Sequence, residues 1–363
     1  MVFLLRCNGC LALLLNIFVT RSSLPRRTVL AVATAATLSI LLNVILIFKL
    51  THKYPTALDD YQPLNTQSIL NTTFFIAPPD PQENAIVTTL YSDAYAVAVA
   101  TLGHSLNRVN STALRILLYI PENVSPRALC IASSTGFYPH AVERIPPPKR
   151  GISRHLQDQY TKLTMWTLEE AGIKGIVYLD ADMLARRNFD ELFNLPFNFA
   201  AVPDVFLDSR SFALNFNAAM LFLRPSPGIF DDMLSKIGSA SYKSDDADQS
   251  FLNHYYGKEA VRLPYVYNVN LAVKLRSPEL WANLMREARI VHYTQIKPFI
   301  VEKDYSGKAR LEIESVAENV RQKLGENGGM FDHEIWEWLR MWQETLRIYS
   351  EELTECRRIS GIV

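Results

Sequence analysis

Two aspartates separated by one small residue follow an apolar run in the segment IVYLDADMLA, residues 176–185. Three β-prone residues lead into Asp180 and Asp182, which predicts a buried strand that ends at the two acids. Two carboxylates this close repel each other and lose hydration, and both effects cost free energy. Either the acids are solvated where the strand meets water, or a cation lies between them. Mg²⁺ and Mn²⁺ bind carboxylate oxygens and commonly complete their coordination with phosphate oxygens.

The segments around the acids predict strands that alternate with helices. Strands are expected at residues 85–90, 114–120, 137–144 and 175–180, a loop that opens a helix at 92–109, and a further helix at 163–172. This alternation is typical of a mostly parallel sheet with helices on both faces. Such sheets bind ligands beyond the carboxyl ends of their strands, where the two acids and Tyr91-Ser92-Asp93 are expected to lie.

Residues 28–48, TVLAVATAATLSILLNVILIF, form an uncharged run near the start of the chain. As a helix, the run is long enough to cross the roughly 30 Å apolar layer of a membrane. Arg21, Arg26 and Arg27 precede it, and Lys49 and Lys53 follow it. The positive-inside rule therefore favours a cytoplasmic tail at 1–27 and a lumenal body. A cleaved signal peptide is the alternative, and the length of the run favours an anchor. The sequence thus predicts a single-pass type II protein of the Golgi or endoplasmic-reticulum membrane.

The rest of the chain divides by composition into three parts. Proline-rich residues 49–82 predict an extended stem, 83–305 a globular domain, and 306–363 a helical region. Apolar residues recur three and four apart in residues 331–353, which predicts an amphipathic helix that packs on the domain. A membrane-surface or acceptor-binding helix is the alternative. Three N-x-S/T sequons, at Asn71, Asn110 and Asn123, follow the apolar run and agree with a lumenal body.

Charge and cysteine content exclude two classes of protein. The 363 residues carry 37 basic and 37 acidic side chains, so no basic surplus argues for a nucleic-acid partner. Four cysteines do not make a disulfide framework. Cys7 and Cys10 form a lone C-x-x-C in the apolar leader, which disfavours a zinc or redox site there. Cys130 and Cys356 could pair, although nothing in the sequence demands it.

A series of blocks, in order between about residues 85 and 300, resembles the glycogenin-like retaining glycosyltransferases, family 8 of the GT-A fold. The blocks are IVTTLYSDAYAVAVATLGHSL, YTKLTMWTL, YLDADMLARRNFDELF, NFNAAMLFLRPS, DDADQSFLNHYY and VHYTQIKPF. A single block is a weak signal, whereas the ordered set is hard to explain by chance. The resemblance implies a GT-A α/β domain behind the membrane anchor.

The resemblance also assigns roles to residues of this chain. Asp182 and His292 would coordinate Mn²⁺ between the two phosphates of a UDP-sugar, and Asp180 would bind the ribose and also touch the metal. Lys297 would add a positive charge on the same phosphates. The other donor contacts implied are Thr89, Tyr91, Ser92, Tyr95, Lys162, Ala181, Asn217 and Ala218. Asp245, Asp248 and Gln249 would line the reacting face, where the acceptor hydroxyl approaches.

Each assignment has a structural alternative, and the blocks depart from the family pattern in places. His292 and Tyr95 could be ordinary core residues, and Asp248 could cap the helix that begins at Gln249. The family often has glycine where Ala219 and Ser250 stand. The closing block usually reads H-F-x-G-x-x-K-P-W, whereas this chain lacks one residue there and has Gln295 for the glycine and Phe299 for the tryptophan. The loop over the phosphates, which carries Lys297, is therefore expected to be shorter and less flexible than the family pattern.

The function implied is Mn²⁺-dependent transfer of a hexose or N-acetylhexosamine from a UDP-sugar, with retention, to an unknown glycan, protein or small-molecule acceptor. The resemblance also allows a homodimer. Self-priming is not expected, because Leu275 stands at the position of glycogenin's own acceptor tyrosine. One alternative is a non-catalytic membrane protein whose degenerate transferase domain binds a nucleotide or a partner. The other is a Mg²⁺-dependent phosphatase, which Met183 and Leu184 disfavour because that class has glycine- or threonine-type residues after its acids.

Overall fold

The structure, a computed structural model, describes residues 25–51, 80–148, 152–153, 156–243, 246–300 and 313–359. Of the residues singled out above, Cys7, Cys10, Asn71 and Asp245 lie outside these ranges, as does most of the predicted stem. The chain separates into two compact units, residues 1–60 and 61–363.

The described part of the first unit, residues 25–51, forms the apolar helix α2 (Arg26–Thr51). Residues Arg27–Ile47 are long and apolar enough to cross a membrane, and most of their side chains are exposed. The hydroxyls of Thr34 and Thr37 donate to the carbonyls of Leu30 and Ala33, so these polar groups need no water. Length and composition are weak support for an anchor, since a signal sequence has the same properties.

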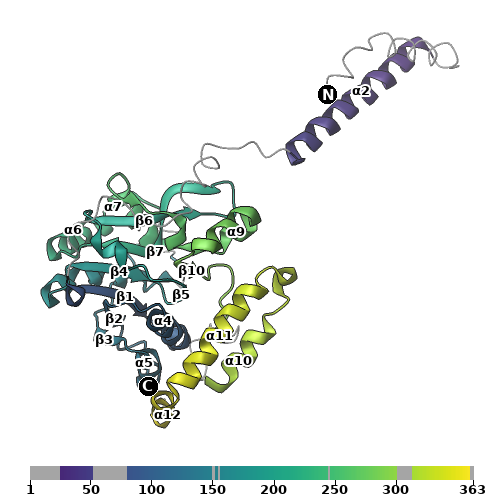
Figure 1. Ribbon diagram of the computed structural model, residues 1–363. Coiled ribbons are helices and arrows are strands. Elements are labelled where there is room, and N and C mark those ends of the chain that lie inside the picture. Colours follow the sequence, from purple (N-terminus) through teal and green to yellow (C-terminus); the bar gives the residue numbers. More distant parts are fainter. Residues whose placement is uncertain are drawn as a thin grey trace. The chain divides into compact units, whose positions relative to one another are not determined.

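The second unit is built on a seven-stranded sheet in the order β3-β2-β1-β4-β7-β6-β8 (Figure 1). Its strands are β1 (Asn84–Leu90), β2 (Leu114–Tyr119), β3 (Tyr138–Ala141), β4 (Gly175–Leu179), β6 (Phe199–Val205), β7 (Phe212–Leu223) and β8 (Val261–Arg262). Only β7 is antiparallel to its neighbours. The strands expected in the first half of the sequence are therefore present, and the sheet is mostly parallel as predicted.

The strand register places the ends of several strands at one edge of the sheet. β4 pairs with β1 in parallel, and with β7 in antiparallel register in which Leu179 lies opposite Met220. Because β7 runs the opposite way, its residues before Met220 lie beyond the carboxyl end of β4. A second, three-stranded sheet in the order β5-β10-β9 continues this edge, with β5 (Met183–Ala185), β10 (Ile290–His292) and β9 (Val269–Asn270).

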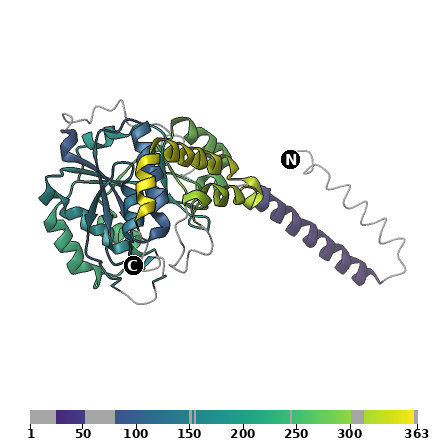
Figure 2. The ribbon, with the colours of Figure 1, turned by 90° about the horizontal axis from the view of Figure 1, so that it is seen from below.

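Helices cover both faces of the main sheet (Figure 2). The described helices of this unit are the 3₁₀ segments η2 (Pro81–Glu83), η3 (Asp93–Tyr95), η5 (Gln159–Ala171), η6 (Asp190–Asn194), η7 (Tyr265–Tyr267) and η9 (Glu326–Gly329), and the α-helices α4 (Ala96–Arg108), α5 (Pro126–Ser133), α6 (Pro227–Ile237), α7 (Ala247–Tyr256), α8 (Ala272–Arg276), α9 (Pro278–Glu287), α10 (Ile313–Gln322), α11 (Asp332–Ile348) and α12 (Ser350–Arg358). The α/β fold class predicted from the sequence is confirmed.

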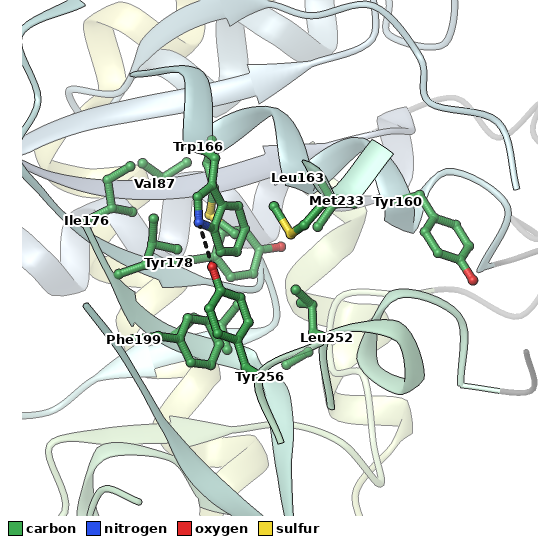
Figure 3. Close-up of a cluster of buried hydrophobic side chains, with 14 of the residues drawn as sticks. Val87, Tyr160, Leu163, Trp166, Ile176, Tyr178, Phe199, Met233, Leu252 and Tyr256 are labelled. Atoms are coloured by element: carbon green, nitrogen blue, oxygen red, sulfur yellow. Dashed lines mark hydrogen bonds between the residues drawn. The ribbon is translucent and has the colours of Figure 1, made fainter. Parts of the chain in front are cut away.

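An aromatic stack in the main core fixes two helices relative to the sheet (Figure 3). Phe199 of β6 and Tyr256 of α7 stack with ring centroids 3.9 Å apart, and Trp166 of η5 stacks on Tyr256 at 6.1 Å. The indole N–H of Trp166 also donates to the Tyr256 hydroxyl at 3.1 Å, which satisfies both buried polar groups. Since Lys162 lies one turn before Trp166, and Asp248 lies on α7, this stack holds the two elements that carry these charges.

The C-terminal helix differs from the prediction. Residues 331–353 were expected to form one helix, whereas α11 ends at Ile348 and α12 begins at Ser350. Tyr349 leaves the helical region (φ −107°, ψ 34°). Its hydroxyl accepts a hydrogen bond from the Asn107 amide at 2.7 Å, and its ring packs edge-on against His104. These contacts with α4 favour the break over a continuous helix.

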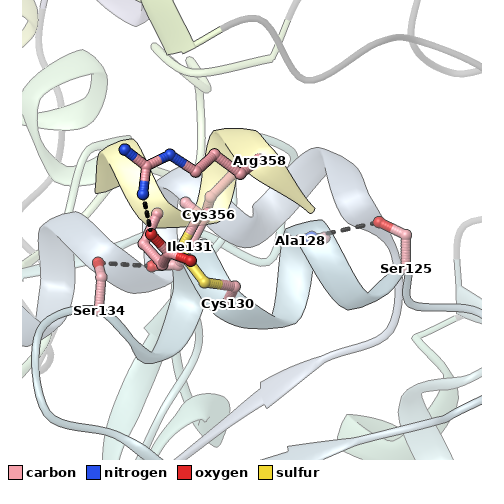
Figure 4. Close-up of a disulfide and its surroundings, with 8 residues drawn as sticks. Ser125, Ala128, Cys130, Ile131, Ser134, Cys356 and Arg358 are labelled. Atoms are coloured by element: carbon pink, nitrogen blue, oxygen red, sulfur yellow. Dashed lines mark hydrogen bonds and ion pairs between the residues drawn. A yellow bond between two sulfur atoms is a disulfide. The ribbon is translucent and has the colours of Figure 1, made fainter. Parts of the chain in front are cut away.

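The break directs α12 toward α5, where Cys356 and Cys130 form a disulfide (Figure 4). Their Cα atoms are 5.5 Å apart, and the bond joins residues separated by 226 positions in the sequence. A cross-link over so long a segment restricts the unfolded chain strongly. The disulfide therefore anchors the C-terminal helices to the domain.

We expect Cys130→Ser and Cys356→Ser each to lower the free energy of unfolding by about 2–5 kcal/mol. The double variant should lose no more than either single variant, because both substitutions remove the same bond. Denaturant unfolding of the full chain, with and without a reductant, measures this. Wild-type stability that does not change on reduction would contradict the assignment.

Candidate active site

The two acids of the opening segment lie between the two sheets. Asp180 follows the last residue of β4, and its backbone N–H donates to the carbonyl of Ala219 at 2.8 Å. Asp182 precedes β5, which pairs with β10 so that Met183 lies opposite His292. The N–H of Tyr293 then donates to the Asp182 carbonyl at 3.0 Å. Main-chain pairing thus places the His292 imidazole beside the acids.

Asp180, Asp182 and His292 offer a set of metal ligands. One ligand atom from each lies within 4.8 Å of the others, and His292 Nε2 is 3.4 Å from Asp182 Oδ1. His292 and Asp182 are 4% and 5% exposed. Burial lowers the pKa of His292 to about 4, so the imidazole is neutral at physiological pH and offers a lone pair. Two carboxylates and a neutral imidazole are ligands that fit Mn²⁺.

The hydrogen bonds behind His292 fix which ring nitrogen carries the proton. The N–H of Ala219 donates to Asn217 Oδ1, so this oxygen is an acceptor, and it also accepts from Asn268 Nδ2 at 3.0 Å. Asn268 Oδ1 is then free only to accept, and it lies 3.2 Å from His292 Nδ1. The proton is therefore on Nδ1, and the lone pair of Nε2 faces the Asp182 carboxylate. A lone pair facing an anion is unfavourable unless a cation lies between them.

A lysine from the segment that follows His292 contacts the same carboxylate. The ammonium group of Lys297, which follows β10, forms an ion pair with Asp182 Oδ2. Burial lowers the pKa of Lys297 to about 8, against the attraction of Asp180. The predicted phosphate-binding lysine is thus next to the predicted metal ligands, and its charge is held at the same carboxylate.

A second lysine, Lys162, is buried among acids on the other side of Asp180. Its ammonium lies 2.9 Å from Asp248 Oδ2 and 3.4 Å from Asp180 Oδ1, and it donates to the Ala218 carbonyl. Burial opposes its charge, but Asp180 and Asp248 outweigh this and raise its pKa. Tyr178 donates to Asp180 at 2.5 Å and stays protonated, because burial and the Asp180 charge raise its pKa.

The position of Asp248 decides whether this residue caps helix α7. Helix α7 begins at Ala247 with Asp246 at its N-cap, and Asp248 lies inside the first turn. Its carboxylate contacts Lys162. It is therefore not the cap that the sequence allowed. Burial raises the pKa of Asp248, and Lys162 opposes that rise.

Sequence reasoning missed Asp204, which ends the polar network on the β6 side. Its carboxylate accepts from Asn217 at 3.1 Å, from Gln249 at 2.8 Å and from the N–H of Val205. Gln249 in turn accepts from the Ala218 N–H. Burial raises the pKa of Asp204. The sequence offered one signal for Asp204, an acid near the end of the apolar run FAAVPDV. It offered no signal for Asn268.

The remaining predicted residues lie around this network. The hydroxyl of Thr89 is 3.1 Å from that of Tyr178, which links the end of β1 to Asp180. Tyr95 packs edge-on against Phe299 at 5.2 Å. Tyr91 and Ser92 lead into η3, and Ala181 is buried between the two acids. Asp245 lies outside the described residues.

The network carries a formal excess of negative charge. The carboxylates of Asp180, Asp182, Asp204 and Asp248 are accompanied by the two ammonium groups of Lys162 and Lys297, while His292 is neutral. A divalent cation is the simplest species that balances such an arrangement. The site can therefore bind a metal together with anionic groups.

The amino-acid sequence matches the model of a known protein family. The model of the family described as "Glycosyl transferase family 8" matches residues 87–299, which is more than half of the chain. The chain belongs to glycosyl transferase family 8. The family resemblance predicted from the ordered blocks is confirmed, and family membership favours a transferase over a phosphatase.

Three relatives show how similar this family 8 transferase is to other proteins. Glycogenin of Neurospora crassa is 28% identical over 216 residues, 58% of this chain and 30% of that protein. Galactinol synthase 4 of Arabidopsis thaliana is 28% identical over 247 residues, 59% of this chain and 72% of that protein. The putative UDP-glucuronate:xylan alpha-glucuronosyltransferase 5 of the same plant is 29% identical over 232 residues, 62% of this chain and 38% of that protein. The match therefore spans only about a third of two of these relatives.

Two solved structures were also found to be similar to the family 8 transferase. Glycosyltransferase GlyE of Streptococcus pneumoniae is 18% identical, with a TM-score of 0.49 over 75% of this chain and 64% of that chain. Galactosyltransferase LgtC, in complex with donor and acceptor sugar analogues, is 17% identical, with a TM-score of 0.46 over 65% of this chain and 94% of that chain.

Lys162→Met should lower the free energy of unfolding by about 3–5 kcal/mol, because it leaves Asp248 buried without a counter-ion. Adding Asp248→Asn to Lys162→Met should recover part of this loss, since the unpaired charge is then removed. Lys236→Met is the matched control, because Lys236 pairs with Asp232 on the exposed surface of α6 and should cost far less. An equal loss of unfolding free energy in Lys162→Met and Lys236→Met, measured by denaturant unfolding, would contradict a special contribution of the buried pair.

Proposed function

We propose that this family 8 transferase moves a hexose or N-acetylhexosamine from a UDP-sugar to an acceptor hydroxyl, with retention of configuration and with Mn²⁺. The observation that carries the proposal is the convergence of Asp180, Asp182 and His292 within the segment that matches the family. The name of one relative specifies a UDP-sugar donor, which supports UDP as the nucleotide. The acceptor is left open.

In this proposal the metal is held by Asp180, Asp182 and His292. When bound, it neutralises the negative charge that grows on the departing diphosphate. Lys297 binds the same phosphates as a point charge. Its ion pair with Asp182 keeps its ammonium at the site before the donor arrives. On donor binding, the Lys297 ammonium would exchange this contact for the donor phosphates.

The polar network on the other side would orient the sugar. The side chains of Asn217 and Asp204 and the main chain of Ala218 would meet sugar hydroxyls, with Lys162 holding Asp180 and Asp248 in place. Thr89, Tyr91, Ser92, Tyr95 and Ala181 are proposed as nucleotide contacts. Asp248, Gln249 and Asp245 would line the reacting face.

Retention is proposed to follow front-face attack. The bond from the acceptor oxygen to the anomeric carbon forms on the side from which the UDP oxygen departs. The acceptor proton passes to the departing phosphate. In this mechanism the residues of the site orient the reactants and balance charge. A covalent nucleophile from the protein is not required.

We also propose that the domain lies in the lumen of the Golgi or the endoplasmic reticulum, held by α2. The disulfide between Cys130 and Cys356 supports this, because such bonds persist in oxidising compartments. The sequon asparagines Asn110 and Asn123 are both exposed on the domain, which is compatible with attached glycans.

The direct test of the reaction is a screen of UDP-sugars with the purified full chain. The expected result is Mn²⁺-dependent release of UDP from one donor class, even without an acceptor. Binding of UDP with Mn²⁺ but no release from any UDP-sugar would instead favour a non-catalytic binding protein. Release of phosphate from a generic aryl phosphate would favour phosphatase chemistry.

Asp182→Asn should abolish this turnover while leaving the fold intact. The change keeps size and shape but removes a charge that balances the cation, and losing such a term costs on the order of 10²–10³ in rate or more. The melting temperature without metal should stay close to the wild-type value, because relief of repulsion from Asp180 offsets the lost partner of Lys297. Asp231→Asn, on the exposed surface of α6, is the control. Wild-type Mn²⁺-dependent turnover in Asp182→Asn would refute the metal site.

Expressed in a eukaryotic secretory system, the full chain should sediment with membranes and shift in size on glycosidase treatment. Asn110→Gln and Asn123→Gln should each remove one step of the shift if both sites carry glycans. Gel mobility before and after treatment measures this. A soluble, unshifted product would contradict the proposed topology.

A further inference from the structure

Helix α11 lies outside the residues that match the family, yet it contacts the segment that carries His292 and Lys297. The hydroxyl of Tyr293, the residue after His292, donates to the backbone carbonyl of Glu334 on α11 at 3.0 Å. Glu334, a residue that is 1% exposed, pairs through its carboxylate with Lys274 at 2.7 Å. Lys274 lies on α8, shortly after β9. Glu334 of α11 therefore contacts the chain just after two neighbouring strands of the small sheet, β10 and β9.

The next turn of α11 reaches the strand that follows Asp182. Glu337 accepts from Arg186 at 2.7 Å in an ion pair whose partners are mostly buried. Arg186 directly follows β5, and its N–H donates to the carbonyl of Arg289, just before β10. This ion pair thus ties α11 to the antiparallel pair of strands that brings Asp182 and His292 together.

An aromatic chain makes the third connection. Trp338, 1% exposed, packs on Phe299 with ring centroids 5.8 Å apart, and Phe299 packs edge-on against Tyr95 at 5.2 Å. Phe299 lies two residues after Lys297, and Tyr95 leads into α4. The rings therefore connect α11 to both the phosphate-binding lysine and the proposed nucleotide contact.

Helix α11 is itself fixed to the rest of the domain beyond these contacts. Glu344 pairs with Arg108 at 3.0 Å and with His104 at 3.4 Å, both on α4. The following helix, α12, is joined to α5 by the disulfide. These contacts fix the C-terminal part of α11. The N-terminal part of the helix can therefore give rigid support to the residues that it contacts.

We propose that α11 is a positioning element of the donor site, and that Trp338, acting through Phe299, and Glu334, acting through Tyr293, hold residues 292–299 in place. Neither residue touches the donor. Their effect is to keep the His292 imidazole and the Lys297 ammonium at the Asp182 carboxylate before binding, which lowers the ordering cost that donor binding would otherwise carry. The consequence for donor affinity rests on the proposed function.

The experiment compares Trp338→Ala with Trp336→Ala in the full chain. Trp336 is on the same helix two residues away and is 42% exposed, so it controls for loss of an indole from α11. Trp338→Phe tests rescue by a smaller aromatic ring. The measurements are hydrogen–deuterium exchange over residues 292–299 without ligand, and the Kd for UDP in the presence of Mn²⁺.

Trp338→Ala is expected to speed exchange over residues 292–299 and to raise the Kd by about tenfold, whereas Trp336→Ala should change neither and Trp338→Phe should recover most of both. A helix that only adds stability would lower the melting temperature of Trp338→Ala and leave its exchange pattern and Kd unchanged. That result would overturn the proposal.

A second variant covers the case in which Trp338→Ala does not fold. Tyr293→Phe removes only the hydroxyl that donates to Glu334, and it should speed exchange at the same residues and weaken UDP binding by about two- to fivefold. Unchanged exchange and Kd in Tyr293→Phe would overturn the proposal. If the wild-type protein binds no UDP with Mn²⁺, the proposed function fails, and the exchange comparison alone decides whether α11 holds this segment.

Discussion

The concentration of negative charge between the two sheets is the constraint on which the rest of the site depends. Main-chain pairing holds the backbones of Asp180 and Asp182 in place, two residues apart between the two sheets. Lys162 and Lys297 approach from opposite sides and offset part of the repulsion. Burying lysines is costly unless they are paired, so the acids and lysines depend on one another. The aromatic stack of Trp166, Tyr256 and Phe199 serves this arrangement, because it fixes the helices that carry Lys162 and Asp248.

The hydrogen-bond chain behind His292 fixes the orientation and the tautomer of the imidazole beside these charges. It starts at the backbone N–H of Ala219, passes through Asn217 and Asn268, and ends at Nδ1 of the imidazole. Because a backbone N–H can only donate, each later partner has one allowed orientation. The chain thereby turns the lone pair of Nε2 toward Asp182. Alanine at position 219, where the family often has glycine, keeps this backbone group and so leaves the chain intact.

The sequence predicted the parts of the molecule whose residues follow a recognisable pattern, either an apolar run or an ordered motif. Apolar runs predicted β1, β2 and β4, and the ordered motifs singled out Asp180, Asp182, His292 and Lys297 as candidate site residues, which the structure brings together. It did not reveal Asp204 or Asn268, because their roles depend on which strands become neighbours. The pairing of Cys130 with Cys356 and the helix break at Tyr349 were hidden for the same reason. Both arise from contacts of the C-terminal helices with α4 and α5, more than 200 residues earlier in the chain.

The most direct test of the account is electron spin-echo spectroscopy of Mn²⁺ bound to the full chain with UDP. The account predicts coupling of the manganese to one histidine nitrogen, together with phosphate phosphorus. The nitrogen coupling should be lost in His292→Ala and kept in His104→Ala, which removes another buried histidine. Tightly bound manganese with no histidine coupling, or a coupling that survives in His292→Ala, would contradict the claim that Asp180, Asp182 and His292 form the metal site.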